Sequence, residues 1–137
     1  MRKIIAALAL SALALGAATT TVVAKEKQTG EQKLAEMLEG RVAGEPKSCI
    51  STVRSGSLQV INKTALVYEA GDTLWVNRTA RPDDLRRDDV LVINQTSGMQ
   101  LCRLDRITTV DQVSHFFTGI VFLQDFVPYR KVAQDAR

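Results

Sequence analysis

The stretch TALVYEAGDTLWVNR, residues 64–78, decides the fold class of this chain. β-prone runs lie on either side of the dipeptide Gly71-Asp72, and glycine at such a turn supplies a positive φ angle without a steric clash at Cβ. The stretch therefore predicts an antiparallel hairpin of two strands. In that register Tyr68 faces Trp75, and an aromatic cross-strand pair contributes about 0.2 to 1 kcal/mol and helps to seat a sheet on its core.

Short β-prone runs with turn residues between them continue on both sides of the hairpin. They cover residues 48–54, 58–61, 90–93, 99–104 and 116–127. We expect Pro128 to end the last strand. No helical stretch of crossover length separates these runs, so the pattern predicts a mostly β domain, built as a small antiparallel β-barrel or sandwich.

One short helix is expected before the strands, over residues 31–39. Leu34, Met37 and Leu38 recur there at three- and four-residue spacing, and Gly40 follows where a glycine commonly ends a helix. A helix of this length is not stable in water by itself. We therefore expect its apolar stripe to pack on the body of the domain.

Residues 81–89 interrupt the β pattern and contain Pro82. They are expected to form a loop or a single helical turn with Asp83 as its cap. Four acidic and three basic residues are interleaved in this segment: Asp83, Asp84, Asp88 and Asp89 with Arg81, Arg86 and Arg87. The carboxylates lack the spacing, the central glycine and the terminal glutamate of a calcium loop, and the arginines nearly neutralise them. The sequence therefore predicts a solvated polar surface here, with no metal and no cofactor.

The first 24 residues have the order of a secretory signal peptide. Arg2 and Lys3 precede an apolar run over residues 4–18, and small residues ending at Ala24 complete a cleavage site. The apolar run is shorter than the roughly 20 residues that cross a bilayer, so an uncleaved anchor is the weaker alternative. We expect cleavage after Ala24 and one small exported domain over residues 25–137, periplasmic or secreted, without a membrane span.

The charge of the exported domain excludes one class of partner. The 137-residue chain has 18 Lys and Arg against 15 Asp and Glu, but Arg2 and Lys3 leave with the signal peptide, so 16 basic residues remain. Affinity for nucleic acid depends on many cations that neutralise phosphates. Nucleic acid is therefore not an expected partner.

The chain has two cysteines, Cys49 and Cys102, both in the exported region. Disulfides persist outside the cytoplasm, so one bridge between them is the expected pairing. They are 53 positions apart, and closing a loop of that length stabilises a fold by roughly 4 kcal/mol in the chain-entropy model. A catalytic thiol or a metal site would need more partners than the single histidine of the chain provides.

Three Asn-X-Thr tripeptides begin at Asn62, Asn77 and Asn94, each at the end of a predicted strand. In a eukaryotic secretory pathway these would be glycosylation sites. The same tripeptides are also ordinary turn sequences, because asparagine tolerates left-handed backbone geometry. The signal peptide, rich in alanine and leucine, is typical of bacteria, which favours turns over glycans.

Several clusters of residues together resemble an uncharacterised family of short exported proteobacterial proteins. The resemblance extends over residues 41–131, and it implies a bacterial periplasmic or secreted protein but no particular activity. The clusters are Ala43-Gly44-Glu45-Pro46 before Cys49-Ile50, Val67-Tyr68 with Gly71, Asn77-Arg78, Met99-Gln100-Leu101-Cys102-Arg103 with Asp105, and Phe126-Val127-Pro128-Tyr129-Arg130-Lys131.

The first hypothesis for function is a non-catalytic domain that binds a protein, an envelope polymer or a small ligand. It rests on a small, disulfide-linked β domain whose sequence shows no convergent nucleophile and base and no set of metal ligands. The candidate contact residues are Tyr68, Trp75 and Arg103.

Two alternatives remain open from the sequence. One is a hydrolase with a dispersed site, in which His115 is the base and Asp105 or Asp111 orients it. No serine of the chain lies in a nucleophile-elbow motif, so the sequence gives this arrangement no independent support. The other alternative is a structural protein of the cell envelope.

Overall fold

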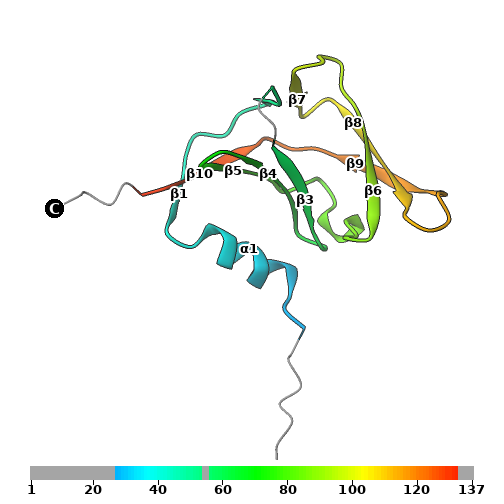
Figure 1. Ribbon diagram of the computed structural model, residues 1–137, viewed down its shortest axis with the longest axis horizontal. Helices are drawn as coiled ribbons and strands as arrows, with labels where there is room; N and C mark the ends of the chain where they lie inside the picture. The colour runs from blue at the N-terminus through cyan, green and yellow to red at the C-terminus, as the bar shows by residue number, and fades with distance from the viewer. Residues whose placement is uncertain (1–26, 54–55, 133–137) are drawn as a thin grey trace, which may run out of the picture.

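The computed structural model describes residues 27–53 and 56–132, and the predicted signal peptide lies outside them. These residues form one α-helix, one 3-10 turn and ten strands, which confirms the mostly β prediction (Figure 1). The elements are α1 (Gly30–Leu38), β1 (Arg41–Ala43), β2 (Cys49–Ser51), β3 (Ser57–Ile61), β4 (Ala65–Ala70), β5 (Thr73–Asn77), η1 (Pro82–Asp84), β6 (Asp89–Asn94), β7 (Gln100–Cys102), β8 (Arg106–Asp111), β9 (Phe117–Phe122) and β10 (Val127–Lys131).

The strands form three open antiparallel sheets. The largest has the order β1-β10-β5-β4-β3, the second pairs β2 with β7, and the third has the order β6-β8-β9. No sheet of the described residues closes into a barrel, so of the two predicted architectures the sandwich is the one that fits.

The predicted hairpin is strands β4 and β5. Tyr68 pairs with Trp75 as expected, and Gly71 occupies the turn with a φ angle of 60°. Glycine adopts this left-handed conformation without the Cβ penalty of other residues. The local signal in the sequence was therefore sufficient to fix the register at the centre of the large sheet.

Helix α1 covers one face of the five-stranded sheet. A capping box joins Thr29 and Gln32 at its N-terminus, and Gly40, with a φ angle of 69°, follows its C-cap. Leu34 is 1% exposed. The side chains packed with it come from β3, β4 and β5: Ile61, Ala65, Val67, Leu74 and Val76. The predicted packing of the helix on the domain is confirmed.

A second core lies on the opposite face of the five-stranded sheet and joins it to the two smaller sheets. From the large sheet it includes Leu66 and Tyr68. Its other buried members come from the remaining sheets and connections: Ile50, Leu85, Leu101, Ile107, Val121, Leu123 and Phe126. Strand β4 is thus buried on both sides, because its alternate residues enter different cores.

The expectation that Pro128 ends the last strand is wrong. Strand β9 ends at Phe122, and Pro128 is the second residue of β10, opposite Trp75. The carbonyl of Pro128 accepts a hydrogen bond of 2.7 Å from the N–H of Gly44. In an antiparallel ladder a residue turns its N–H and C=O to the same neighbour. The N–H that proline lacks therefore faces Gly44, just past the end of β1, and no continuous ladder is broken.

Two further details differ from the sequence predictions. The 3-10 turn Pro82–Asp84 has Arg81 at its N-cap, without a side-chain hydrogen bond, so Asp83 lies inside the turn and is not its cap. Strands β1 and β8 were not predicted, nor was β10 beyond its first residue, Val127. Strand β8 is the central strand of the third sheet. Because it was not predicted, the pairing of strands in that sheet was not predicted either.

Candidate protein-binding surface

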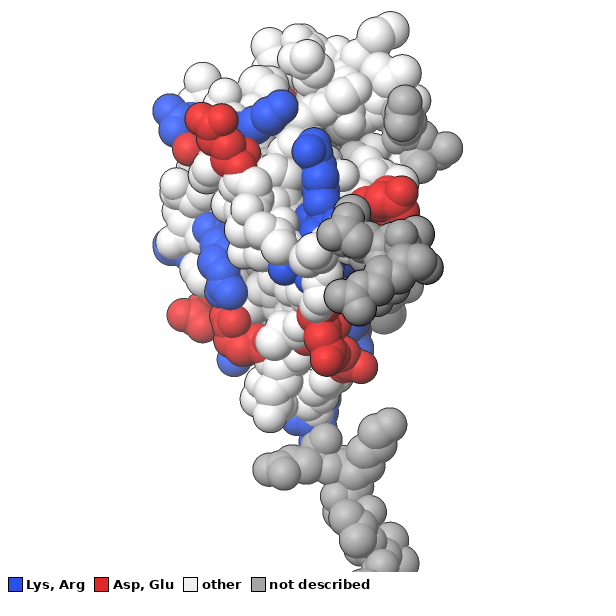
Figure 2. Space-filling view, turned by 90° about the vertical axis from the view of Figure 1, so that its left-hand side faces the viewer, with Lys and Arg blue, Asp and Glu red and all other residues white. Residues whose placement is uncertain are grey.

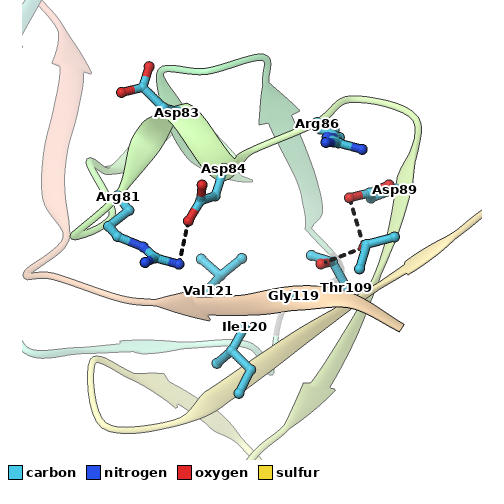
Figure 3. A pocket seen from close by; sticks show the side chains of 10 residues that line it. Arg81, Asp83, Asp84, Arg86, Asp89, Thr109, Gly119, Ile120 and Val121 are labelled. Carbon is cyan, nitrogen blue, oxygen red and sulfur yellow. Dashed lines mark hydrogen bonds and ion pairs between the residues drawn. The ribbon is translucent and has the colours of Figure 1, made fainter. Parts of the chain in front are cut away.

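The third sheet, β6-β8-β9, has one covered face and one uncovered face. On the covered face Ile107, Thr109 and Val121 are buried. Figure 3 shows Val121 and Ile120 on opposite sides of strand β9. The residues in register on the side of Ile120 are mostly apolar, with Arg106 and Asn94 at one end. We call seven of them the outer face: Val90, Val92, Thr108, Val110, Phe117, Ile120 and Phe122.

The strand register arranges the outer face in three rows. The first row is Val90, Val110 and Phe117, and the middle row is Val92, Thr108 and Ile120. In the third row Phe122 lies beside Arg106, which in turn lies opposite Asn94. Side chains within a row are direct cross-strand neighbours, so the apolar groups form one continuous surface.

A β-bulge determines that Phe117 belongs to this surface. Gly119 pairs with Thr109 and Phe117 with Val110, so Thr118 is the extra residue of β9. The hydroxyl of Thr118 lies 2.8 Å from Thr109 Oγ1 and 3.0 Å from Asp89 Oδ2, on the covered side. The bulge therefore keeps Thr118 on the covered side and turns Phe117 outward.

Several apolar side chains of the outer face are strongly exposed to solvent. Phe117 is 63% exposed, Phe122 57%, and Val90 and Val92 slightly over 40% each. Together with the partly buried members, the apolar surface is on the order of 500 Å², near the upper end of the largest patches on monomeric proteins, which are often functional. Single exposed apolar residues are common on proteins, but a continuous sheet face of this size indicates an interaction surface.

Opposite charges stand at the two ends of this sheet. Arg106 is exposed in the third row, and within the described residues it has no ion-pair partner. Asp88 precedes β6 at the other end, with its side chain 89% exposed and only a 3.9 Å contact to Arg87. None of the seven residues of the outer face is charged.

Elsewhere the charged residues of both signs are mixed. Figure 2, which looks at the left-hand side of the molecule as drawn in Figure 1, shows Lys and Arg interspersed with Asp and Glu, without a large area of one sign. An example is the ion pair between Arg78 of the loop after β5 and Glu31 of α1, at 2.7 Å. This face therefore offers no basic surface of the kind that holds a phosphate backbone.

The three contact residues proposed from the sequence do not lie together on the outer face. Tyr68 is buried in the second core, and Trp75 is half-buried beside it in the hairpin, with Lys47 Nζ 5.9 Å from its ring centre. Arg103 is exposed after β7 and forms an ion pair of 3.4 Å with Asp125. Tyr68 and Trp75 thus pack in and beside the second core.

The predicted disulfide is confirmed and joins β2 to β7. Cys49 and Cys102 are direct partners in the ladder of the two-stranded sheet. A cleft of about 450 Å³ opens beside the bridge, and Asp105 lines it. Asp105 is buried and accepts hydrogen bonds from the backbone N–H groups of Cys102, at 2.7 Å, and Thr96, at 3.0 Å.

These hydrogen bonds set the charge of Asp105. Burial by itself would raise the pKa of the carboxyl, but the N–H groups of Cys102 and Thr96 outweigh it and hold the pKa below its usual value. The carboxylate fixes the start of β8 to the β6–β7 loop. It therefore has a structural role, through its hydrogen bonds to Cys102 and Thr96.

The polar segment 81–89 lines a small pocket of about 180 Å³ on the covered side of β9 (Figure 3). Arg81 pairs with Asp84 at 2.6 Å, and Asp89 accepts the hydroxyl of Thr118. Within residues 27–53 and 56–132, no three His, Cys, Asp or Glu side chains converge as metal ligands would. Arg81, Asp84, Asp89 and Thr118 of this pocket are thus paired with one another.

His115 lies at the exposed tip of the β8–β9 hairpin, with a φ angle of 58°. Asp111 accepts hydrogen bonds from Ser114 N–H, at 2.7 Å, from the Ser114 hydroxyl, at 2.8 Å, and from Val113 N–H. These donors lower the pKa of Asp111, Ser114 most of all. The Ser114 hydroxyl therefore bonds directly to the Asp111 carboxylate, so Ser114, His115 and Asp111 do not form the relay of a serine hydrolase.

The outer face was accessible in part from the sequence. Residues 90–93 of β6 and residues 107–110 of β8 are β-prone, which indicates strands, but β6 is apolar without interruption, so its sequence does not separate a covered from an uncovered face. The bulge in β9 has no such signal, because simple alternation groups Phe117 with Gly119 and Val121 on the covered side.

Comparison with known proteins adds no assignment. No family model, curated protein sequence or solved structure matches the chain. The resemblance to an exported proteobacterial family therefore stays a prediction. Among the described residues, no helix is long and apolar enough to cross a membrane.

Proposed function

We propose that this chain is an exported, non-catalytic domain, periplasmic or secreted, that binds a protein through the outer face of β6, β8 and β9. The observation that carries the proposal is the continuous apolar surface of this sheet, with Phe117 and Phe122 more than half exposed. Water contact with such a surface is unfavourable, so covering it with a partner is a direct source of binding free energy.

The shape and chemistry of the outer face favour a protein over the other ligands considered. A small molecule is usually held in a concave pocket that buries most of its surface, whereas this face is one side of a sheet. A polysaccharide needs hydrogen-bond partners for its hydroxyl groups, and among the seven residues Thr108 supplies the only side-chain hydroxyl. A protein partner can match an apolar sheet face with a polar rim.

Export is supported by two independent features. The disulfide between Cys49 and Cys102 suits an oxidising compartment. The order of charged, apolar and small residues at the start of the sequence is that of a signal peptide.

Site-specific photo-crosslinking tests the proposal. A photoreactive phenylalanine analogue replaces Phe117 in the full chain, which is produced in cells and irradiated there. The matched control carries the same analogue at Val42, an apolar residue of edge strand β1 that is 59% exposed. We expect strong protein adducts from position 117 and few from position 42. Equal yields at both positions, or no adduct at 117, would contradict the proposed binding surface.

A further inference from the structure

We infer that the protein bound by the outer face is a second copy of this chain, packed face to face in a two-fold symmetric dimer. This inference rests on the proposed function, because it names the partner of the same surface. Its carrying observations are the composition of the outer face, its area, and the placement of Arg106 and Asp88 at opposite ends of the sheet.

A second copy offers the surface that the outer face requires. Two sheets pack face to face at a separation of about 10 Å when both inner faces are apolar and their strands are nearly aligned. A two-fold interface uses the same residues on both copies, so an apolar face is automatically matched by an apolar face. The assembled sheets would form the second layer that β6-β8-β9 lacks on its outer side.

The charges select one of the two aligned arrangements. If the strands of the two copies ran in the same direction about the two-fold axis, each Arg106 would face the Arg106 of the other copy. If the strands run in opposite directions, Arg106 of each copy reaches the end of the sheet that carries Asp88 in the other. Like charges opposed across an interface are costly and opposite charges are favourable, so the reversed arrangement is selected.

The reversed arrangement also matches the middle row and the two phenylalanines of β9. The middle row of Val92, Thr108 and Ile120 then lies along the axis and meets its own counterpart. The first row of each copy then faces the third row of the other copy. Phe117 of one copy therefore meets Phe122 of the other, twice in the dimer. Aromatic pairs of this kind contribute about 0.5 to 1.5 kcal/mol beyond the area that they bury.

The area is sufficient for a specific but modest dimer. Two outer faces bury on the order of 1,000 Å² together, which is the lower limit for a specific protein interface. Arg106, Asn94 and Asp88 would add to this area at the rim. We therefore expect dissociation in the micromolar range and not an obligate dimer.

Sedimentation of the exported chain measures the association directly. The expected result is a monomer–dimer equilibrium with a dissociation constant of about 10 μM. The V92D variant places a carboxylate on the two-fold axis, opposite its own copy, and is expected to sediment as a monomer. The control variant V42D, on β1 of the other sheet, is expected to dimerise as the unchanged chain does.

Charge reversal tests the arrangement of the two copies. We expect R106D to weaken the dimer about tenfold, and the double variant R106D/D88R to recover most of the loss, because the pair is only exchanged. In the arrangement with strands in the same direction, R106D would only exchange the repulsion between two arginines for one between two aspartates, so the affinity would be nearly unchanged. That result would overturn the reversed arrangement.

A cross-link at the axis gives a second readout that does not depend on affinity. A short bis-maleimide added to T108C is expected to join two chains, because Thr108 of the central strand lies on the axis. The matched control V42C is expected to stay monomeric under the same treatment. Cross-linking that is equal in both variants would count against the interface.

The outcomes separate this inference from the proposed function. A covalent adduct at position 117 with twice the mass of the chain supports the second copy. A chain that sediments as a monomer at about 100 μM overturns the inference, since a specific interface of this area would be populated there. If adducts with a different protein form at position 117 in that case, the binding surface stands and its partner is another protein. If none forms, both are wrong.

Discussion

The five-stranded and three-stranded sheets show what the apolar content of a strand does and does not determine. In β4 of the larger sheet, Leu66 and Tyr68 enter one core and Ala65 and Val67 enter the other. In β8 of the smaller sheet, Ile107 is buried but Val110 lies on the outer face. Both strands are rich in apolar and β-branched residues, yet only one is covered on both sides by the described chain.

The difference comes from a single covering element. Helix α1 lies over one face of the large sheet, and Leu34 closes that core. No described helix or strand covers the outer face in the same way, and Phe117 and Phe122 stay more than half exposed. A sheet face that is apolar in sequence is therefore covered either by the chain itself or by a partner, and the strand sequence alone does not distinguish the two.

A matched pair of substitutions gives the largest expected effect. V67D places a carboxylate at a fully buried position of β4, and V92D places the same group on the outer face. We expect V67D to lower the free energy of unfolding by more than about 4 kcal/mol, because an unpaired charge is buried. V92D is expected to lower that of the monomer by less than about 1 kcal/mol. Urea denaturation of dilute protein measures both.

A milder change keeps this comparison measurable if V67D does not fold. V67A should still lower the stability by about 2 kcal/mol through the cavity that it leaves, while V92A should have little effect on the monomer. Similar losses at positions 67 and 92 would mean that the outer face is covered within the chain, and the contrast between the sheets would be lost.

The sequence predicted the larger sheet better than the smaller one for physical reasons. The hairpin around Gly71 joins strands that are adjacent in sequence, so a local turn signal sets the pairing of Tyr68 with Trp75. Strand β6 instead pairs with β8 across the whole of β7, which belongs to another sheet. Such a pairing depends on packing between distant residues, and no short stretch of sequence encodes it.

The candidate surface was less predictable than the fold. Tyr68 and Trp75 were predicted contact residues, but their large aromatic side chains lie in or beside the core. Phe117 belongs to the outer face only because Thr118 forms a bulge, held by Thr109 and Asp89. Hydrogen bonds between three separate strand positions decide its orientation, and they exist only after the sheet has formed.

Replacing Asp105 tests how the smaller sheet is anchored to the rest of the molecule. D105N substitutes an amide for one of the oxygens that accept the N–H groups of Cys102 and Thr96. We expect a loss of about 2 kcal/mol at pH 7, because a charge-assisted pair of buried hydrogen bonds is disrupted. Thermal unfolding of both chains measures the difference.

The stability difference between the unchanged chain and D105N is expected to depend on pH. The pKa of Asp105 is lowered in the folded state, so the folded protein binds fewer protons than the unfolded one. Its stabilisation is complete above the unfolded pKa of about 3.9 and is lost as the pH falls through the lower folded value. The difference between the unchanged chain and D105N should therefore shrink below about pH 4. A difference that is constant down to pH 2 would show that the carboxylate charge has no part in the anchoring.

The smallest expected effect concerns the helix that covers the larger sheet. Thr29 accepts the N–H of Gln32, and the Gln32 side chain accepts the N–H of Thr29, so T29A removes one half of a capping box. We expect a loss of about 1 kcal/mol in unfolding free energy, and a smaller loss for the control Q32A, because the threonine oxygen satisfies an N–H of the first helical turn. Hydrogen exchange should rise in α1 while the dimer equilibrium is unchanged, since α1 covers the other sheet. If T29A instead weakened association at the outer face, the two sheets would not be independent surfaces, and the role of α1 as a cover for the larger sheet alone would have to be abandoned.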